Sequence, residues 1–189
     1  MVNSERQFPR DHDDELYQHV VNEAVTTIGT TQDDIAFAER LSRTAVDMVQ
    51  TAYAHTSQQH QRYITLFTVC VVYVDDLGKR HLDALAQFSH RFAKGEKQPH
   101  PVLERLVELM RESYDLWPQV GADAIVFATL DFISAMYVEC TSGDMEITPQ
   151  ATWWPNYFRK KTGLCPQYAH FIFVKGWRLN ADSYMQLLP

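Results

Sequence analysis

The sequence lacks several patterns that would assign it to common functional classes. No stripe of lysine and arginine runs along the chain, and 24 acidic residues outnumber 17 basic ones, which gives a net charge of -7. Because a basic stripe is what holds a phosphate backbone, nucleic acid is not expected as a partner. GxGxxG, P-loop and GxSxG patterns are all missing, so nucleotide-binding and hydrolase functions have no support.

Cysteine is scarce, and long apolar runs are missing. The three cysteines, Cys70, Cys140 and Cys165, form no CxxC pair, and no histidine pattern makes a zinc site. They predict reduced thiols in a cytoplasmic protein. The first residues, MVNSERQFPRDHDDE, contain no apolar signal region. The longest apolar run is shorter than the roughly 20 residues that a spanning helix needs, so no membrane span is expected.

Apolar residues are nevertheless abundant, and their spacing predicts helices. Of the 189 residues, 46% are hydrophobic, which suits a sizeable core. They recur at three and four positions, and no hairpin turn separates the strings VCVVYV and FIFV from alternating neighbours, so the prediction is all-α. A polar segment and first helix (1–30) should precede the main helical domain (31–189). We expect helices over about 14–28, 32–52, 58–77, 80–94, 101–116, 120–140 and 155–161, and a last one opened by Pro166.

The helix expected over 58–77 is apolar on nearly every side and then ends in two adjacent carboxylates, Asp75 and Asp76. A carboxylate that emerges from a core is costly unless something compensates its charge. Solvent, a basic neighbour such as Lys79 or Arg80, or a hard cation such as Mg²⁺ would each do so. Acidic pairs at helix ends are usually solvated or salt-bridged, so the motif alone leaves all three open.

A second stretch, ATWWPNYFRKKTG (151–163), places Arg159, Lys160 and Lys161 after a cluster of aromatic residues. One of these cations can fold over a cavity and hold a phosphate. A solvated basic turn at a helix C-terminus explains the same residues, since the helix dipole favours cations there.

A third stretch, ATLDFISAMYVEC (128–140), brings Phe132 and Tyr137 to a helix that is otherwise apolar. They predict either the lining of a hydrophobic pocket or ordinary core. Glu139 is unusual in these surroundings, and we expect it to pair with a basic residue of the segment that follows.

Together these stretches resemble the trichodiene synthase family of fungal class I sesquiterpene cyclases. The strings that carry the resemblance are VVYVDDLGK, AQFSHRFAKGEKQPHPVLERLVELM, TLDFISAMYVE, WWPNYFRKKTGL and PQYAHFIF, which fall within about residues 34–174. The resemblance implies a helical bundle of the class I terpene synthase type, matched only in its N-terminal half and therefore incomplete at the C-terminal side.

The resemblance also implies a reaction and its residues. In the family, Mg²⁺ ions clamp the diphosphate of farnesyl diphosphate or another prenyl diphosphate, and Asp75 and Asp76 match the metal-binding aspartates. Arg159 matches the arginine that senses the diphosphate, in a pattern that has a glycine four residues on. Asp75 and Arg159 are thus the implied catalytic residues.

The implied reaction leaves an allylic cation, which needs an apolar cavity that steers it without quenching it. Aromatic faces attract such a cation by about 2 kcal/mol or more when desolvated. The candidates for this lining, which would contact the substrate together with Arg159, are Phe67, Phe132 and Tyr137.

The sequence departs from the family pattern at two places. Lys79 stands where the motif usually has a third acid, four residues after Asp75 and spaced for an ion pair with it; Asp83 follows one turn later. No N-D-x-x-S-x-x-x-E pattern is found, and the nearest string, NADSYMQLL, lacks its spacing. Two hypotheses stay open: a Mg²⁺-dependent sesquiterpene cyclase, or a truncated non-catalytic helical interaction module whose exposed apolar surface favours a homo-oligomer.

Overall fold

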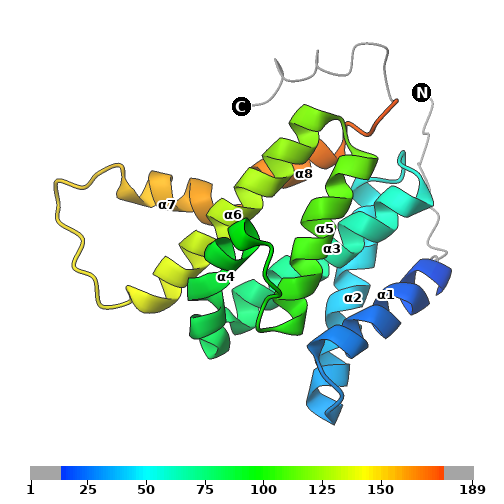
Figure 1. The fold of residues 1–189 in the computed structure, drawn as a ribbon, viewed down its shortest axis with the longest axis horizontal. Helices are drawn as coiled ribbons and strands as arrows, with labels where there is room; N and C mark the ends of the chain where they lie inside the picture. The colour runs from blue at the N-terminus through cyan, green and yellow to red at the C-terminus, as the bar shows by residue number, and fades with distance from the viewer. Residues whose placement is uncertain (1–13, 177–189) are drawn as a thin grey trace, which may run out of the picture.

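The computed structural model describes residues 14–176, and all regular structure in that range is helical (Figure 1). The elements are α1 (Asp14–Ile28), α2 (Gln32–Ala52), α3 (Gln58–Leu77), the 3₁₀ helix η1 (Gly78–His81), α4 (Leu82–Lys94), α5 (Pro101–Leu116), α6 (Gln119–Thr141), α7 (Trp154–Thr162) and α8 (Cys165–Phe171). The all-α prediction is confirmed. The polar residues expected before α1 and the string NADSYMQLL lie outside the described residues.

The turn between α1 and α2 shows how local chemistry sets a helix start. Thr31 caps α2: its hydroxyl accepts the N–H of Asp34 at 3.2 Å, and the Asp34 carboxylate accepts the N–H of Thr31 at 3.4 Å. Gly29 allows this arrangement, because a Cβ there would lie 2.4 Å from a carboxylate oxygen of Asp34. Thr31 and Asp34 therefore form a capping box at the start of α2.

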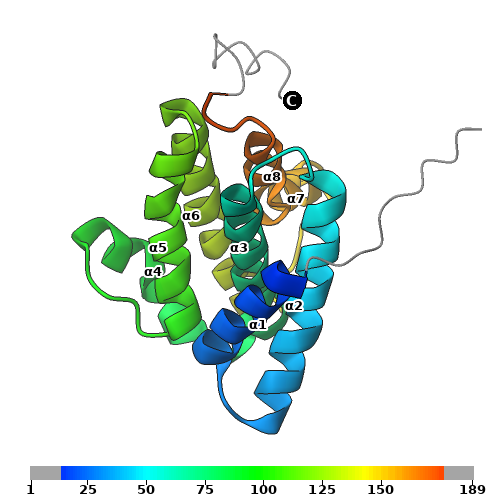
Figure 2. The same ribbon diagram turned by 90° about the vertical axis from the view of Figure 1, so that its right-hand side faces the viewer.

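Helix α3 is the centre of the bundle. Figure 2 shows it between α5 and α6 on one side and α1 and α2 on the other. Every residue from Tyr63 to Val71 is buried, as expected of a helix that is apolar all round. The elements on both sides thus fix the position of its C-terminal end, where Asp75 and Asp76 lie.

One end of the core is aromatic and ties α3 to the chain around α5 and α8. The Trp117 ring lies 4.6 Å from that of Tyr63 and 5.2 Å from that of Phe171. The indole N–H of Trp117, which is fully buried, donates to the carbonyl of Phe171 at 3.3 Å. This cluster holds α8 against α3.

An ion-pair network links α1 to α5 beside the core. Arg105 is 15% exposed and donates to Glu23 at 2.5 Å and to Glu112 at 2.7 Å. Burial lowers the pKa of this guanidinium, but the hydrogen bonds and charges of the two glutamates raise it by more, so Arg105 stays charged. Helix α1 is thereby fixed to α5 as well as to α2 and α3.

The division of the chain at residue 30 into a first segment and a main helical domain stays a prediction.

Helix α6 is apolar on every side, but only part of it is covered. Among residues 14–176 it is the one helix long and apolar enough to cross a membrane by length and composition, a test that core helices of soluble proteins also pass. It packs against α4, α5, α7 and α8. Its outer face remains open: Phe127 is 67% exposed, and Val120, Tyr137 and Val138 are exposed too.

Candidate functional site

The chain continues past the paired aspartates without breaking. Gly78 remains in the right-handed helical region and donates its N–H to Val74, so α3 tightens into η1 instead of ending in a left-handed turn. A Cβ on Gly78 would lie 3.2 Å from a methyl group of Leu85, so the glycine lets α4 approach closely. The acidic pair therefore lies at the closely packed corner between α3 and α4, with both side chains exposed.

Asp75 lies where α3 meets the end of α6. Partial desolvation raises the pKa of Asp75, and the neighbouring charge of Asp76 raises it further. Burial also raises the pKa of Cys140 on α6, with the charges of Glu139 and Asp75 raising it and that of Lys79 lowering it. The charges of Asp75, Lys79 and Glu139 therefore act on the same group, Cys140. A cation bound beside Asp75 would offset the repulsion between Asp75 and Asp76.

Lys79 does not relieve that repulsion as the sequence suggested. The ion pairs of the described residues include none between Asp75 and Lys79, so the expected pair is wrong. The spacing of four residues brings side chains together only on a continuous α-helix. Here α3 ends at Leu77, and Lys79 lies in the 3₁₀ turn.

Helix α7 carries Arg159, which is exposed and forms no ion pair within residues 14–176. The glycine four residues later has a structural reason: a Cβ on Gly163 would lie 2.7 Å from the carbonyl oxygen of Arg159. Leu164 follows with φ 51°, in the left-handed region, and leads into α8. The sharp corner between α7 and α8 thus places Arg159 just before a tightly packed turn.

A different basic residue anchors α7. Lys161 donates to both carboxylate oxygens of Asp131 on α6, at 2.6 and 2.5 Å, and this hydrogen bonding raises the pKa of Lys161. The acid expected to pair with the following segment was Glu139, which forms no ion pair in the described range, so that assignment was wrong. With Lys161 occupied, Arg159 is left available for a ligand.

The three aromatic candidates lie in different surroundings. Phe67 is fully buried, with its ring 5.2 Å from that of Phe171 and 6.4 Å from that of Tyr168. Phe132 is 1% exposed, whereas Tyr137 is 36% exposed near the end of α6. Their role in lining a substrate cavity stays a prediction.

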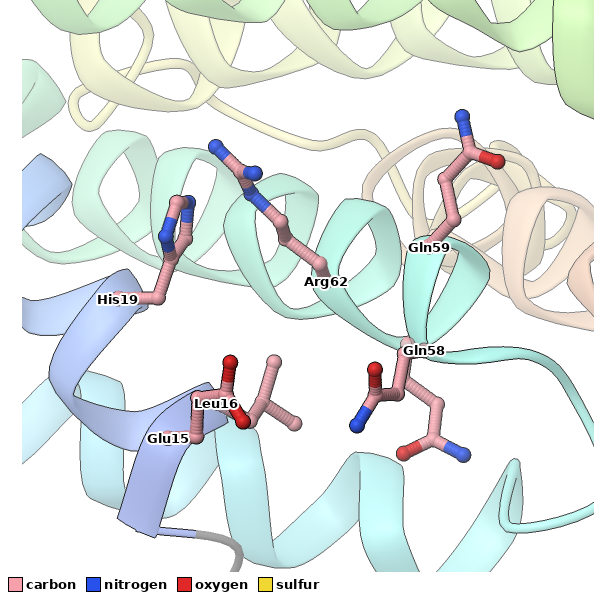
Figure 3. A pocket seen from close by; sticks show the side chains of 7 residues that line it. Glu15, Leu16, His19, Gln58, Gln59 and Arg62 are labelled. Atoms are coloured by element: carbon pink, nitrogen blue, oxygen red, sulfur yellow. The ribbon is translucent and has the colours of Figure 1, made fainter.

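Three cavities are open to solvent away from these aromatic residues. Figure 3 shows one of about 270 Å³ between α1 and the first turns of α3, where His19 and Arg62 extend from facing helices. A second, also about 270 Å³, lies between α3 and α5, and a third of about 550 Å³ lies between η1, α4 and the segment before α5. None of these three is lined by Asp75, Asp76 or Arg159.

Sequence reasoning missed a cluster beside the acidic pair. Tyr73, one turn before the end of α3, contacts His81 and His100 through its hydroxyl, at 3.0 and 3.2 Å. These residues are 8 and 27 positions away along the chain. The one local signal was His100 immediately before Pro101, which fits a helix N-cap.

Comparison with known proteins settles the family. The sequence pattern that defines the family described as Trichodiene synthase (TRI5) matches residues 8–186. The chain belongs to the trichodiene synthase family. The resemblance to that family, expected from the sequence, is confirmed.

Several fungal terpene synthases are similar to this family member. Alpha-cuprenene synthase COP6 of Coprinopsis cinerea is 28% identical over 151 residues, which are 79% of this chain and 46% of the relative. Terpene synthase BipA of Cochliobolus sativus is 28% identical over 155 residues, 81% of this chain and 47% of the relative. (E)-beta farnesene synthase of Metarhizium brunneum is 26% identical over 122 residues, 64% of this chain and 37% of the relative. The chain spans about half the length of these curated relatives or less.

The acidic pair fits the Mg²⁺ ions on which members of the trichodiene synthase family generally depend. Mg²⁺ is usually held by one or two carboxylates together with substrate phosphates and waters, not by an all-protein cage. Asp75 and Asp76 supply that number of ligands, and no group of three or more His, Cys, Asp or Glu side chains placed for a metal occurs within residues 14–176. Partial desolvation and the charge of Asp76 raise the pKa of Asp75, so a cation bound there would favour its ionised form.

Proposed function

We propose that the chain takes part in a sesquiterpene cyclase reaction, in which Asp75 and Asp76 bind Mg²⁺ and farnesyl diphosphate loses its diphosphate. The observation that carries this proposal is the end of α3. The buried helix α3 ends in two adjacent, exposed carboxylates that form no ion pair within residues 14–176, and partial desolvation and the charge of Asp76 raise the pKa of Asp75. Family membership supplies the substrate class.

The residues of this chain would act by position and charge. Mg²⁺ bound there would supply positive charge to the phosphate oxygens as the carbon–oxygen bond breaks. Arg159 would donate hydrogen bonds from a planar fork to the departing diphosphate, and within residues 14–176 no acidic side chain forms an ion pair with it. Phe132 and Tyr137 lie on the helix that meets the acidic corner, so they are the aromatic faces we propose for the cation.

The test is an assay of the full chain with farnesyl diphosphate and Mg²⁺. We expect Mg²⁺-dependent release of diphosphate and a sesquiterpene hydrocarbon or alcohol in the organic extract. Arg159→Gln should lower the rate by about 10²-fold, the usual effect of removing one donor to developing negative charge. Lys160→Gln, one residue along and also exposed, is the matched control and should change it little. No product and no Mg²⁺-dependent release would contradict the proposal for this chain.

The open face of α6 favours a second candidate, a helical interaction module without catalysis. Phe127 on α6 is 67% exposed. Trp153 just before α7 and Tyr157 on α7 are 78% and 54% exposed, and such apolar surface favours association. Light scattering on the preparation used for the assay separates the two. Inactive protein that associates as its concentration rises supports the module, and a stable inactive monomer contradicts both candidates.

A further inference from the structure

Three side chains from three elements meet beside the acidic corner. Tyr73 comes from α3, His81 is the last residue of η1, and His100 precedes α5. The imidazole ring centres lie 4.2 Å apart, and the Tyr73 ring lies 5.3 Å from that of His100. The Tyr73 hydroxyl is 3.0 Å from Nε2 of His81 and 3.2 Å from Nε2 of His100. One oxygen thus joins two imidazoles that are far apart in the sequence.

The backbone of α5 fixes the tautomer of His100. Nδ1 of His100 accepts the N–H of Val102 at 3.2 Å, so this nitrogen carries no proton. Burial and the neighbouring His81 lower the pKa of His100 to about 4, which keeps the ring neutral near pH 7. The single ring proton must therefore be on Nε2, which donates to Tyr73.

The direction of the second hydrogen bond follows from the first. Burial and the charge of Asp34 raise the pKa of Tyr73, while Arg80 lowers it by less, so the phenol keeps its proton. With its oxygen accepting from His100, we infer that the hydroxyl donates its own proton to Nε2 of His81, the second nitrogen within hydrogen-bond distance, since this arrangement gives each donor an acceptor. His81 is then neutral with its proton on Nδ1, and the hydrogen bonds run in one direction from α5 through α3 to η1.

This direction argues against a metal at the cluster. A histidine ligates through a nitrogen that carries no proton, and Nε2 of His100 carries one as long as Nδ1 caps α5. We propose instead that Tyr73, His81 and His100 are positioning residues: their hydrogen-bond chain holds η1, and Lys79 with it, in a fixed position relative to Asp75 and Asp76, and acid releases it.

Acid breaks the chain because both imidazoles function as neutral groups. A proton on Nε2 of His81 would turn the acceptor of the Tyr73 hydroxyl into a donor, and one on Nδ1 of His100 would remove the cap of α5. The surrounding charges are those of Lys79 and Arg80 on η1, Asp83 on α4 and Asp34 on α2, with Glu139 of α6 acting on Cys140 beside Lys79.

The sign of the pH dependence follows from the lowered pKa values. Burial and Arg80 lower the pKa of His81, and that of His100 is about 4, against 6.5 for a free imidazole. Between these values the unfolded chain binds more protons than the folded one. The stabilising contribution is thus complete above pH 6.5 and is lost as the pH falls toward 4.

Histidine NMR on the unchanged full chain tests the direction of the hydrogen bonds. With ¹⁵N-labelled histidine at pH 7, we expect His81 with its proton on Nδ1 and His100 with its proton on Nε2, and we expect His100 to titrate near pH 4. The opposite tautomers, or titration of both rings near 6.5, would overturn the proposal. Because no substitution is involved, this result does not depend on whether a variant folds.

Hydrogen exchange of the η1 amides tests whether the chain holds this segment. Tyr73→Phe keeps the ring but removes both hydrogen bonds, so exchange of residues 79–82 should become about tenfold faster at pH 7. His81→Gln is the conservative control, since its amide oxygen replaces Nε2 as acceptor, and it should exchange as the unchanged chain does. Between pH 7 and 4 the unchanged chain should lose more protection than Tyr73→Phe. Equal exchange in Tyr73→Phe and the unchanged chain would overturn the proposal.

The link to the acidic pair rests on the proposed function and has its own readout. Mg²⁺ added to ¹⁵N-labelled protein should shift the amide signals of Asp75 and Asp76, and Tyr73→Phe should weaken this binding several-fold while His81→Gln does not. No Mg²⁺ shift in the unchanged chain would contradict the proposed function, and the tautomer and exchange results would still decide the hydrogen-bond chain. Equal Mg²⁺ affinity in Tyr73→Phe would show that the chain does not position the aspartates.

Discussion

Asparagine in place of Asp75 is expected to lower Mg²⁺-dependent diphosphate release by at least about 100-fold, the scale seen when one group that stabilises developing charge is removed. Asn keeps the shape and one oxygen ligand but loses the negative charge that attracts the cation. Diphosphate release at saturating farnesyl diphosphate, measured over a Mg²⁺ series, is the readout. A loss of Mg²⁺ affinity and of the rate together identifies a metal ligand.

Stability separates this effect from unfolding. The pKa of Asp75 is raised in the folded chain, so its ionised carboxylate lowers the free energy of unfolding above that pKa. Asp75→Asn should therefore melt at the same temperature as the unchanged protein or higher. Asp83→Asn, in the exposed first turn of α4, is the matched control. If Asp83→Asn loses activity and Asp75→Asn does not, the metal ligands have been assigned to the wrong turn.

Alanine in place of Trp117 is expected to lower the free energy of unfolding by about 3–5 kcal/mol, the usual cost of deleting a fully buried Trp side chain. The indole fills the space between Tyr63 and Phe171, and its N–H satisfies the Phe171 carbonyl. Its loss leaves a cavity and an unpaired carbonyl at the contact between α3 and α8. Urea unfolding followed by far-UV circular dichroism measures the change.

Two variants show which part of Trp117 matters. Trp153→Ala removes the same side chain from a position that is 78% exposed and should change the free energy of unfolding by no more than about 0.5 kcal/mol. Trp117→Phe keeps an aromatic ring but lacks the N–H. Its loss of unfolding free energy should therefore lie between those of Trp117→Ala and Trp153→Ala. An equal loss at both tryptophans would mean that the buried cluster does not hold α8.

Helix ends with a local chemical signal could be predicted from the sequence. The helices expected over about 32–52 and 101–116 begin at Gln32, after the capping box of Thr31 and Asp34, and at Pro101, whose ring suits the first turn of a helix. Helix α4 was expected from Arg80 but begins at Leu82, after the 3₁₀ turn. At this turn Leu85 lies close to Gly78, a tertiary contact that residue spacing cannot reveal.

Residues of the candidate site can be placed together from the sequence only where one helix carries them, and their functional role stays a prediction. Asp75 and Asp76 are adjacent at the end of an apolar helix, so the sequence alone shows that their charge needs solvent, a basic neighbour or a cation. The partners of Asp131 and Tyr73 depend on how α6 meets α7 and how η1 meets the start of α5. For that reason the sequence predicted an ion pair for Glu139 and not for Asp131, and it did not show that His81 and His100 lie together.

The backbone at Leu164, in the corner between α7 and α8, is strained, and the packing of its side chain offsets that strain. A left-handed backbone costs a residue with a Cβ about 1 kcal/mol or more, and Leu164 adopts it with φ 51°. Its side chain is partly buried against the core, and that packing offsets the strain. The bend that carries Arg159 is therefore a property of the intact core and not of the local backbone preference, and it should relax as soon as this side chain loses its neighbours.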